Sequence, residues 1–249
     1  MGMVHGVPES SRPSPLRDHR RPADAVLFDF HGTIAQVEDP VDWVVGAAWA
    51  CGVAVAPAQA TGLADRLVTA GRAGGPVPTR VPVHLMEVWA ERDLSPHAHR
   101  AAYEGLAATV DTDIDGLATA LYERLLRPEG WRLYPDTLPT LQALRGAGVA
   151  VGVVSNIGFD LRPLAEELGI AEYVDAWTLS CDLGRCKPDP AVFAFACQAL
   201  GADPARTLMV GDTPADAGAV AAGCRAFVLP AAPPGERNDL GLALNLVLG

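Results

Sequence analysis

The sequence has almost no lysine, no excess of basic charge and no long apolar run. All but one of its 19 basic residues are arginines, and Lys187 is the exception. The formal net charge of −11 argues against a nucleic-acid-binding protein, because such proteins carry a basic face. No uncharged apolar run approaches the roughly 18 residues that a transmembrane helix requires. We therefore expect neither nucleic acid nor a membrane as a partner.

Cysteines are few and irregularly spaced. The five cysteines are an odd count, and Cys181 and Cys186 have neither a second cysteine pair nor a nearby histidine to complete a zinc site. We expect buried, reduced thiols, as is usual in a cytoplasmic protein. Residues 1–23 are rich in Pro, Ser and Arg and lack the apolar segment of a secretory signal. We interpret them as a disordered tail, with a basic peptide that binds a partner as the alternative.

Apolar runs alternate with helical patterns in the first and last parts of the sequence. The run Ala25–Phe28 is too short for a helix and apolar enough for a strand buried on both faces. Further strands are expected at 149–154, 173–179, 207–210 and 226–229, and helices at 136–147, 161–168, 191–200 and 216–222. This alternation predicts an α/β fold with a doubly wound parallel sheet of the Rossmann-like type.

The segment between these parts shows only helical patterns. Helices are expected at 42–54, 58–70, 84–92, 96–110 and 113–126. The stretch 71–82 is rich in Gly and Pro, which predicts a loop and a candidate lid. We therefore expect a core built from 24–39 and 129–249, with a helical insert at 40–128.

Polar residues follow the ends of the predicted strands. A doubly wound sheet brings the carboxyl ends of its strands to one edge, where ligands bind. The residues concerned are Asp29 and His31, Ser155 and Asn156, Asp212 and Asp216, and Lys187 in a loop after a further strand. Carboxylate oxygens favour magnesium over zinc. A phosphoryl group between Mg²⁺, Lys187 and Ser155 would have its charge neutralised during transfer. The single lysine indicates a position where a guanidinium does not substitute for a compact ammonium.

Four short motifs occur in order along the chain. They are Asp29-Phe-His-Gly-Thr33, Val154-Ser-Asn156, Lys187-Pro-Asp-Pro190 and Val210-Gly-Asp-Thr-Pro-Ala-Asp216. This set resembles the four motifs of the haloacid dehalogenase-like hydrolase superfamily, and the resemblance extends from residue 24 to residue 230. It implies that the helical insert is a cap that closes over the active site.

The resemblance also implies a role for each motif residue. Asp29 would be the nucleophile and would carry the phosphoryl group as an aspartyl-phosphate. Magnesium would be held by Asp29, Asp212, Asp216 and the backbone carbonyl of His31. The phosphoryl group would be bound by Thr33, Ser155, Asn156 and Lys187. Lys187 would also neutralise the charge of the nucleophile, which makes it part of the catalytic set with Asp29 and His31.

His31 departs from the superfamily's pattern. The phosphatases usually carry a second aspartate at this position, which protonates the leaving group and then activates water. Imidazole has a pKa near 6.5 against about 3.9 for aspartate, so a histidine can exchange protons in both directions near neutral pH. Either His31 replaces the aspartate as general acid and base, or it lies out of reach and substrates with good leaving groups are favoured.

The sequence thus predicts a magnesium-dependent phosphatase acting on a small phosphorylated metabolite. The alternatives are a phosphotransferase or mutase, and a catalytically weak binding protein that keeps the fold. A dehalogenase fits less well, because those enzymes do not use magnesium and the Asp212–Asp216 pair indicates a metal. The sequence names neither the substrate nor the oligomeric state.

Substrate choice would be made by side chains of the cap. The candidates are Trp43, Arg66, Arg72, Arg80, His84, Trp89, His97 and His99. Tryptophans at such positions more often belong to a core. His97 and His99 are two apart on a predicted helix and so point to different faces, and we expect both on a solvated surface rather than at a metal.

Overall fold

The computed structural model describes residues 21–233 and 235–249. Its centre is a five-stranded parallel sheet with the strand order β5-β4-β1-β6-β7. The strands are β1 (Ala25–Phe28), β4 (Ala150–Ser155), β5 (Ala176–Leu179), β6 (Thr207–Gly211) and β7 (Arg225–Val228). All four residues of the central strand β1 are fully buried. The charge-free run at Ala25–Phe28 therefore forms the buried strand that the sequence predicts.

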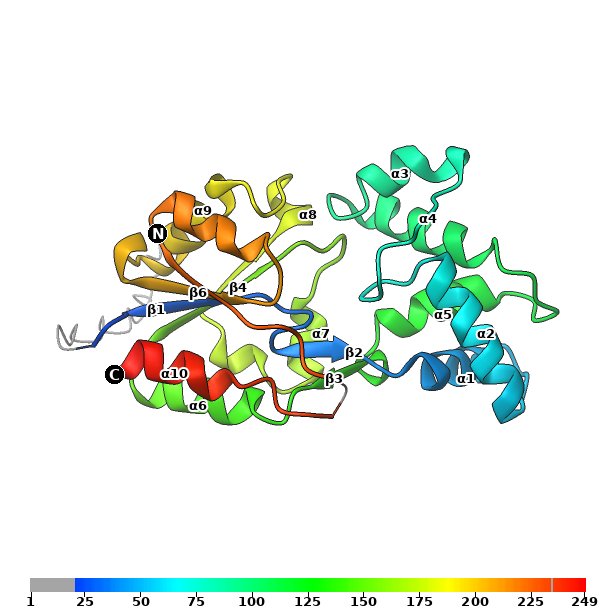
Figure 1. Ribbon diagram of the computed structural model, residues 1–249, viewed down its shortest axis with the longest axis horizontal. Coiled ribbons are helices and arrows are strands. Elements are labelled where there is room, and N and C mark those ends of the chain that lie inside the picture. The colour runs from blue at the N-terminus through cyan, green and yellow to red at the C-terminus, as the bar shows by residue number, and fades with distance from the viewer. Residues whose placement is uncertain (1–20, 234) are drawn as a thin grey trace, which may run out of the picture.

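Helices cover both faces of this sheet (Figure 1). On one face lie α6 (Thr137–Gly146), α7 (Arg162–Glu167) and α10 (Leu240–Leu248), and on the other α9 (Pro190–Leu200) with the 3-10 helix η5 (Asp216–Ala222). Side chains alternate across a strand, so Val26 and Phe28 pack in the core on one face and Leu27 in the core on the other. The predicted doubly wound α/β fold is confirmed.

A helical insert lies between two short strands that leave the core. Strands β2 (Ala35–Val37) and β3 (Trp131–Leu133) pair antiparallel. Between them run α1 (Pro40–Ala50), α2 (Pro57–Ala70), η1 (Val83–Leu85), α3 (Met86–Ala90), α4 (Pro96–Ala107), α5 (Leu117–Leu125) and η2 (Pro128–Gly130). The insert has a hydrophobic cluster of its own, with Trp43, Leu67 and Leu121 among its buried members. It stands beside the sheet domain in Figure 1.

Polar contacts join the two chain segments that connect insert and core. The Arg124 guanidinium binds both carboxylate oxygens of Glu38, at 2.5 and 2.7 Å. Glu38 also donates its backbone N–H to the carbonyl of Gly130, while Arg72 donates to the carbonyl of Glu38 at 2.8 Å. The Glu38 side chain is 1% exposed. A buried charge that is paired and hydrogen-bonded in this way fixes the geometry of the connection.

Some predicted elements differ from those observed. The helix expected at 84–92 is split between η1 and the short α3, because Pro82 and the turn at Glu91 limit it. A one-turn helix α8 (Ser180–Leu183) occupies part of a predicted loop, and 216–222 is a 3-10 helix. Two further 3-10 turns, η3 (Ala171–Tyr173) and η4 (Pro204–Arg206), precede β5 and β6. Helix α10 was not predicted.

The predicted tail lies mostly outside the described residues, which begin at residue 21. Its last three residues, 21–23, are described and make contacts with the sheet domain. Ala23 is fully buried, and Arg206 donates a hydrogen bond to the carbonyl of Arg21 at 2.9 Å. The chain thus contacts the sheet domain before β1 begins, and the boundary expected at residue 23 stays a prediction.

All five cysteines are free thiols. Cys197 and Cys224 are buried, but Cys51, Cys181 and Cys186 are only partly so. The expectation of buried thiols is wrong for these three. Among the described residues, no helix combines the length and the apolar character needed to cross a membrane.

Candidate active site

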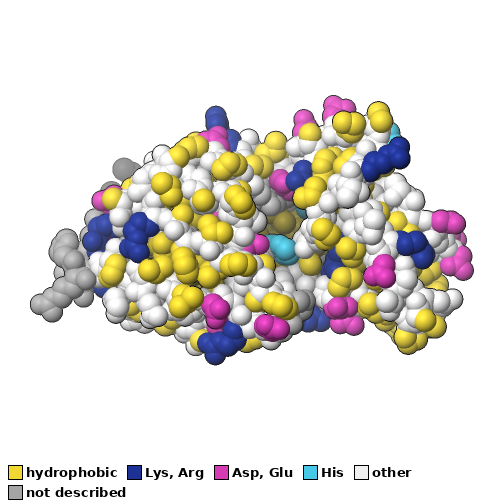
Figure 2. All heavy atoms as spheres, in the orientation of Figure 1, with side chains coloured by type: hydrophobic (Ala, Val, Ile, Leu, Met, Phe, Trp, Pro, Cys, Tyr) yellow, Lys and Arg dark blue, Asp and Glu magenta, His cyan; other side chains and the backbone are white. Residues whose placement is uncertain are grey.

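The carboxyl ends of three neighbouring strands bring the first, second and fourth motifs together. Asp29 follows β1, Ser155 ends β4 and Asp212 follows β6, and β1 pairs with both of the other strands. The Asp29 N–H donates to the carbonyl of Val210 at 2.9 Å, which extends the ladder to the site itself. Figure 2 shows acidic and histidine side chains where the surface is hollowed between the sheet domain and the insert.

Lys187 joins two of the acids. Its Nζ lies 2.7 Å from Asp29 Oδ1 and 2.6 Å from Asp216 Oδ1, and the residue is 6% exposed. Burial alone would lower the pKa of Lys187, but the charges of the two carboxylates and their hydrogen bonds outweigh it and raise this pKa. The ammonium therefore stays charged, and it holds one oxygen of Asp29 in place.

Asp29, Asp212 and Asp216 form an acidic cluster whose ligand atoms all lie within 4.8 Å of one another. Asp212 Oδ1 is buried and has no hydrogen-bond partner in the described part of the chain. Burial, the charges of the other two acids and a hydrogen bond with Asp29 raise the pKa of Asp212 to about 7. A buried carboxylate oxygen that lacks a partner is costly unless something binds it. The donor set suits a hard divalent cation such as Mg²⁺.

Asp216 is more fully engaged than its two neighbours. Its Oδ1 accepts from Lys187, and its Oδ2 accepts from the backbone N–H and the hydroxyl of Thr213, at 3.0 and 2.8 Å. It is fully buried at the start of η5. These contacts orient Asp216, so Asp29 and Asp212 are the acids with oxygens left to bind a cation directly.

Gly32 allows the turn after Asp29 to lie against Asp212. Its φ is +80°, a conformation that favours glycine. A Cβ on Gly32 would come within 2.3 Å of Asp212 Oδ2. A side chain at this position would therefore displace either the Asp212 carboxylate or the turn itself.

The predicted phosphate-binding residues have different surroundings. Ser155 is 4% exposed at the end of β4. The Asn156 amide bonds the backbone of Lys187 at both ends, donating to its carbonyl at 3.0 Å and accepting from its N–H at 2.7 Å. Thr33 is fully buried, and its hydroxyl has no partner among the described residues. The contacts of Asn156 position Lys187, whereas a phosphate contact of Asn156 or Thr33 stays a prediction.

His31 lies where the core meets the insert. Its ring packs edge-on against Trp131, with the centroids 6.0 Å apart. A Cβ on Gly74, in the loop of the insert, would come within 2.6 Å of His31 Nε2. Burial lowers the pKa of His31, the charge of Asp29 opposes this and the charge of Arg72 adds to it. The imidazole is therefore neutral at neutral pH.

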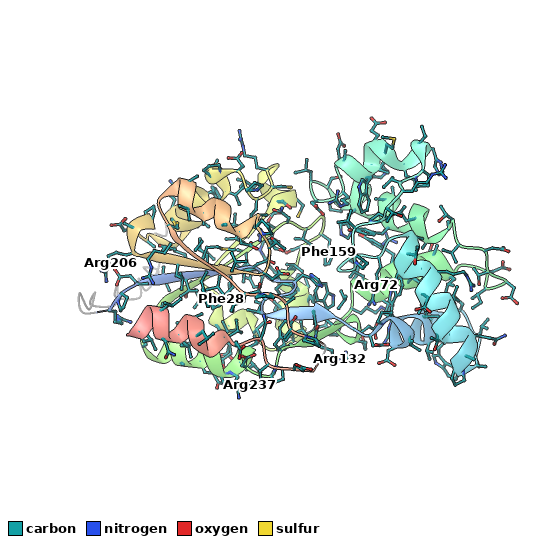
Figure 3. All side chains as sticks on the ribbon, viewed as in Figure 1. Phe28, Arg72, Arg132, Phe159, Arg206 and Arg237 are labelled. Carbon is teal, nitrogen blue, oxygen red and sulfur yellow. The ribbon has the colours of Figure 1, made fainter. Side chains whose placement is uncertain are left out.

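The insert also contacts the loop that follows Ser155. A Cβ on Gly158 would come within 2.2 Å of the carbonyl oxygen of Arg92 and 2.4 Å of His99 Cβ. The Ser180 hydroxyl donates to the carbonyl of Asp93 and accepts from the N–H of Ile157. Figure 3 places Phe159 on the core side of this junction and Arg72 on the insert side. The insert thus contacts loops at the edge of the sheet where the acids lie.

The expectation that His99 lies on a solvated surface is wrong. His99 is 1% exposed, and its Nδ1 lies 2.8 Å from the Tyr122 hydroxyl. The reason is the buried face of α4, which also carries Ala98, Ala102 and Leu106. Only His97, two residues earlier, is exposed as expected.

The other candidates from the insert divide between interior and surface. Trp43 is buried and donates to the carbonyl of Leu121, as expected of a core tryptophan. Arg72 is 7% exposed and stacks on Trp43 at 4.4 Å, and burial lowers its pKa to about 10. Trp89 is partly buried beneath Arg92. Arg66, Arg80 and His84 are exposed.

Two residues near the site were missed from the sequence. Gly74, which faces His31, belongs to a Gly-Gly pair that signals a turn, but no local pattern shows what lies beneath it. Asn238 donates hydrogen bonds to the carbonyls of Gly32 and Thr33. It precedes an apolar run, which is typical of a helix start, and nothing in that pattern connects it with the first motif.

Comparison with known proteins finds relatives that are described as hydrolases or phosphatases. Residues 23–223 match the family model described as haloacid dehalogenase-like hydrolase. A phosphoglycolate phosphatase from Nitrosospira multiformis is 27% identical over 215 residues, which are 84% of this chain and 84% of that protein. Haloacid dehalogenase-like hydrolase domain-containing protein 3 from Danio rerio is 32% identical over 99 residues, which are 40% of this chain and 41% of that protein.

Solved structures share the fold. A HAD phosphatase from Thermococcus onnurineus is 26% identical with a TM-score of 0.52, covering 87% of this chain and 89% of that one. A dehalogenase with a TM-score of 0.64 covers 94% of this chain and 100% of that one, and at 23% identity it shows the fold alone. Because the family model spans most of the sequence, including all four motifs, the chain belongs to the haloacid dehalogenase-like hydrolases.

Proposed function

We propose that this protein is a magnesium-dependent phosphatase that removes phosphate from a small phosphorylated metabolite through an aspartyl-phosphate on Asp29. The observation that carries the proposal is the position of Lys187, which bridges Asp29 and Asp216 in the cluster that contains Asp212. One oxygen of Asp212 has no partner among the described residues. The charge of Lys187 does not balance the three carboxylates of Asp29, Asp212 and Asp216. The site therefore suits an anionic substrate only if a further cation binds there. Mg²⁺ bound by oxygens of Asp29, Asp212 and the His31 carbonyl, with Asp216 helping to hold the metal and its waters, would neutralise charge on the phosphoryl group.

The chemistry of the chain's own residues follows from their placement. An Asp29 oxygen attacks phosphorus, and the bond to the ester oxygen of the leaving group breaks. Lys187 keeps the nucleophile oriented, and Lys187 and Ser155 bind the phosphoryl oxygens. Water then attacks phosphorus, which releases inorganic phosphate and restores the Asp29 carboxylate. Asp29 keeps both of its carboxylate oxygens, and the oxygen of the attacking water becomes part of the released phosphate.

His31 supplies the proton transfers in this scheme. With its lowered pKa the imidazole is neutral at neutral pH, which is the form that accepts a proton from the attacking water. Only the protonated fraction can act on the leaving group, so substrates whose leaving group needs little help are favoured. The opposite hypothesis, that His31 takes no part, predicts that substitution of His31 leaves the pH profile unchanged.

Substrate size is set by the insert, residues 40–128, which we propose acts as a cap over the active site. Gly74 lies over His31, and Arg92 and His99 lie over Gly158. These contacts bring the insert against the loops of the site, which favours a small substrate over a polymer. The phosphoglycolate phosphatase among the relatives makes phosphoglycolate the first candidate to test. A phosphotransferase would instead need a second phosphorylated molecule in the same space. A location in the cytoplasm stays a prediction.

Hydrolysis of a generic aryl phosphate tests the proposal, with and without Mg²⁺, in the native protein and in Asp29→Asn. Asp65→Asn is the matched control, because Asp65 is exposed on α2. We expect activity that requires Mg²⁺, that is lost in Asp29→Asn and that is retained in Asp65→Asn. Activity without metal, or activity that survives in Asp29→Asn, contradicts the mechanism. No turnover in a panel that includes phosphoglycolate favours the binding-protein alternative.

A further inference from the structure

The segment after β7 reaches back to the first motif through Asn238. Asn238 is 2% exposed, and its side-chain N–H groups donate to the carbonyls of Gly32 and Thr33 at 3.0 and 2.8 Å. Its side-chain oxygen accepts from the N–H of Ala232 at 2.9 Å. Both ends of the amide are therefore used, and the two carbonyls of the turn that follows His31 have a buried donor in common.

Asp136 holds this segment from the other side. Its two carboxylate oxygens accept from the backbone N–H groups of Asn238 and Leu240, each at 3.0 Å, and it is 2% exposed. Asp239, between them, has φ +55°, a left-handed conformation that is uncommon outside glycine. The segment is thus held in a strained conformation. In this conformation the backbone N–H groups of Asn238 and Leu240 both reach the Asp136 carboxylate, and the side-chain amide of Asn238 reaches the turn.

The turn is the part of the first motif that touches Asp212. Gly32 packs so closely on Asp212 Oδ2 that a Cβ would come within 2.3 Å of it. A shift of Gly32 therefore changes the space between Asp29 and Asp212. Asn238 fixes both carbonyls of this turn, although it lies beyond residue 223, where the match to the family model ends.

We propose that Asn238 is a positioning residue that holds the Gly32–Thr33 turn against Asp212 and so fixes the separation of the Asp29 and Asp212 carboxylates. The effect on Mg²⁺ and on turnover rests on the proposed function, whereas the effect on the turn does not. Groups that orient the ligands of a metal in this indirect way typically contribute about 10–100-fold to metal affinity or activity. The alternative is that Asn238 only anchors α10.

Two variants separate these roles. Asn238→Asp keeps the size of the side chain but replaces the donating NH₂ group by an oxygen. The carbonyls of Gly32 and Thr33, which accept hydrogen bonds from Asn238 in the native protein, then lose their donor. Val247→Ala loosens the buried face of α10, where the side chain belongs to the core cluster rather than to the turn. Asn238→Ser, which keeps one donor, serves if Asn238→Asp does not fold.

The first measurement is amide hydrogen exchange over residues 29–35 in the metal-free protein, and the second is calorimetric titration with Mg²⁺ alone. In Asn238→Asp we expect faster exchange at the Gly32 N–H, which bonds the carbonyl of Ala35, and Mg²⁺ affinity about 10–100-fold weaker. Val247→Ala leaves both near the native values, and Asn238→Ser lies between.

Equal exchange and equal affinity in Asn238→Asp and Val247→Ala would overturn the proposal, and so would faster exchange with Mg²⁺ affinity unchanged. A native protein that binds no Mg²⁺ contradicts the proposed function instead. In that case the exchange of the Gly32 N–H alone decides whether Asn238 holds the turn.

Discussion

Gly74 of the insert lies against His31 of the core, so closely that a Cβ on Gly74 would come within 2.6 Å of His31 Nε2. The two residues belong to segments separated by two helices, and the loop that carries Gly74 has no regular structure of its own. The imidazole proposed to transfer protons therefore has its Nε2 next to the backbone of the insert. Any movement of this loop changes the surroundings of His31.

Substitution of Gly74 tests the importance of this contact. In Gly74→Ala the new methyl group displaces either the loop or the imidazole. We therefore expect kcat for an aryl phosphate to fall by about 10-fold or more, with the roughly 10²–10⁴-fold cost of losing acid–base catalysis as the upper limit. Gly52→Ala is a matched control, because Gly52 has φ +77° against +71° for Gly74, but its Cβ position has no atom of the described residues within 4 Å. Equal activity of the two variants would show that the contact has no role in turnover.

The raised pKa of Asp212 predicts how the stability of the metal-free protein depends on pH. The folded protein keeps a proton on Asp212 up to about pH 7, whereas the unfolded chain releases it near 3.8. Folding stability is therefore lost as pH rises through this window. Asp212→Asn removes that loss, so its melting temperature relative to the native protein rises between about pH 5 and about pH 8 in EDTA. A difference that stays constant with pH would contradict the assignment.

His99 gives a pH dependence of the opposite sign. Burial and the charge of Arg92 lower its pKa from 6.5 to about 3, so below pH 6.5 the unfolded chain binds a proton that the folded protein excludes. Stability is lost as the pH falls through this window. His99→Asn, which can still bond the Tyr122 hydroxyl, lacks this loss. We expect the melting temperature of the native protein minus that of the variant to be larger at about pH 7.5 than at about pH 5. Thermal melts in matched buffers measure this difference, and a difference that does not change with pH would contradict the lowered pKa of His99.

The ion pair between Glu38 and Arg124 predicts a large effect on stability. Arg124→Met leaves the Glu38 carboxylate buried without its partner, which costs about 3–5 kcal/mol of unfolding free energy. Adding Glu38→Gln removes the uncompensated charge, so the double variant recovers part of the loss. Urea unfolding of the two single variants and the double variant measures this coupling. A double variant less stable than Arg124→Met would show that the charge is not the cause.

The core was predictable because its signals are local. The run Ala25–Phe28 is apolar at every position, and only a strand buried on both faces requires that pattern. Once parallel strands are recognised, Asp29 and Asp212 must meet at the same edge. The order of the motifs then placed Lys187 near them, and the structure gives its contacts with Asp29 and Asp216.

The remaining features depend on contacts between distant segments. His99 was expected in solvent because a single histidine on a helix carries no sign of the Tyr122 hydroxyl and the Phe159 ring that surround it. Asn238 drew no attention in the sequence, and its bonds to Gly32 and Thr33 cross almost the whole chain. Periodicity and turn chemistry describe neighbours in sequence and do not encode such pairings.

The most direct test of the mechanism is detection of the phosphorylated nucleophile. The native protein is mixed with an aryl phosphate and Mg²⁺, quenched in acid within the first turnovers, digested and analysed by mass spectrometry. We predict phosphate on the peptide that contains Asp29 and none in Asp29→Asn. Rapid phosphate release with no phosphopeptide at any quench time, or phosphate on a different residue, would contradict the account.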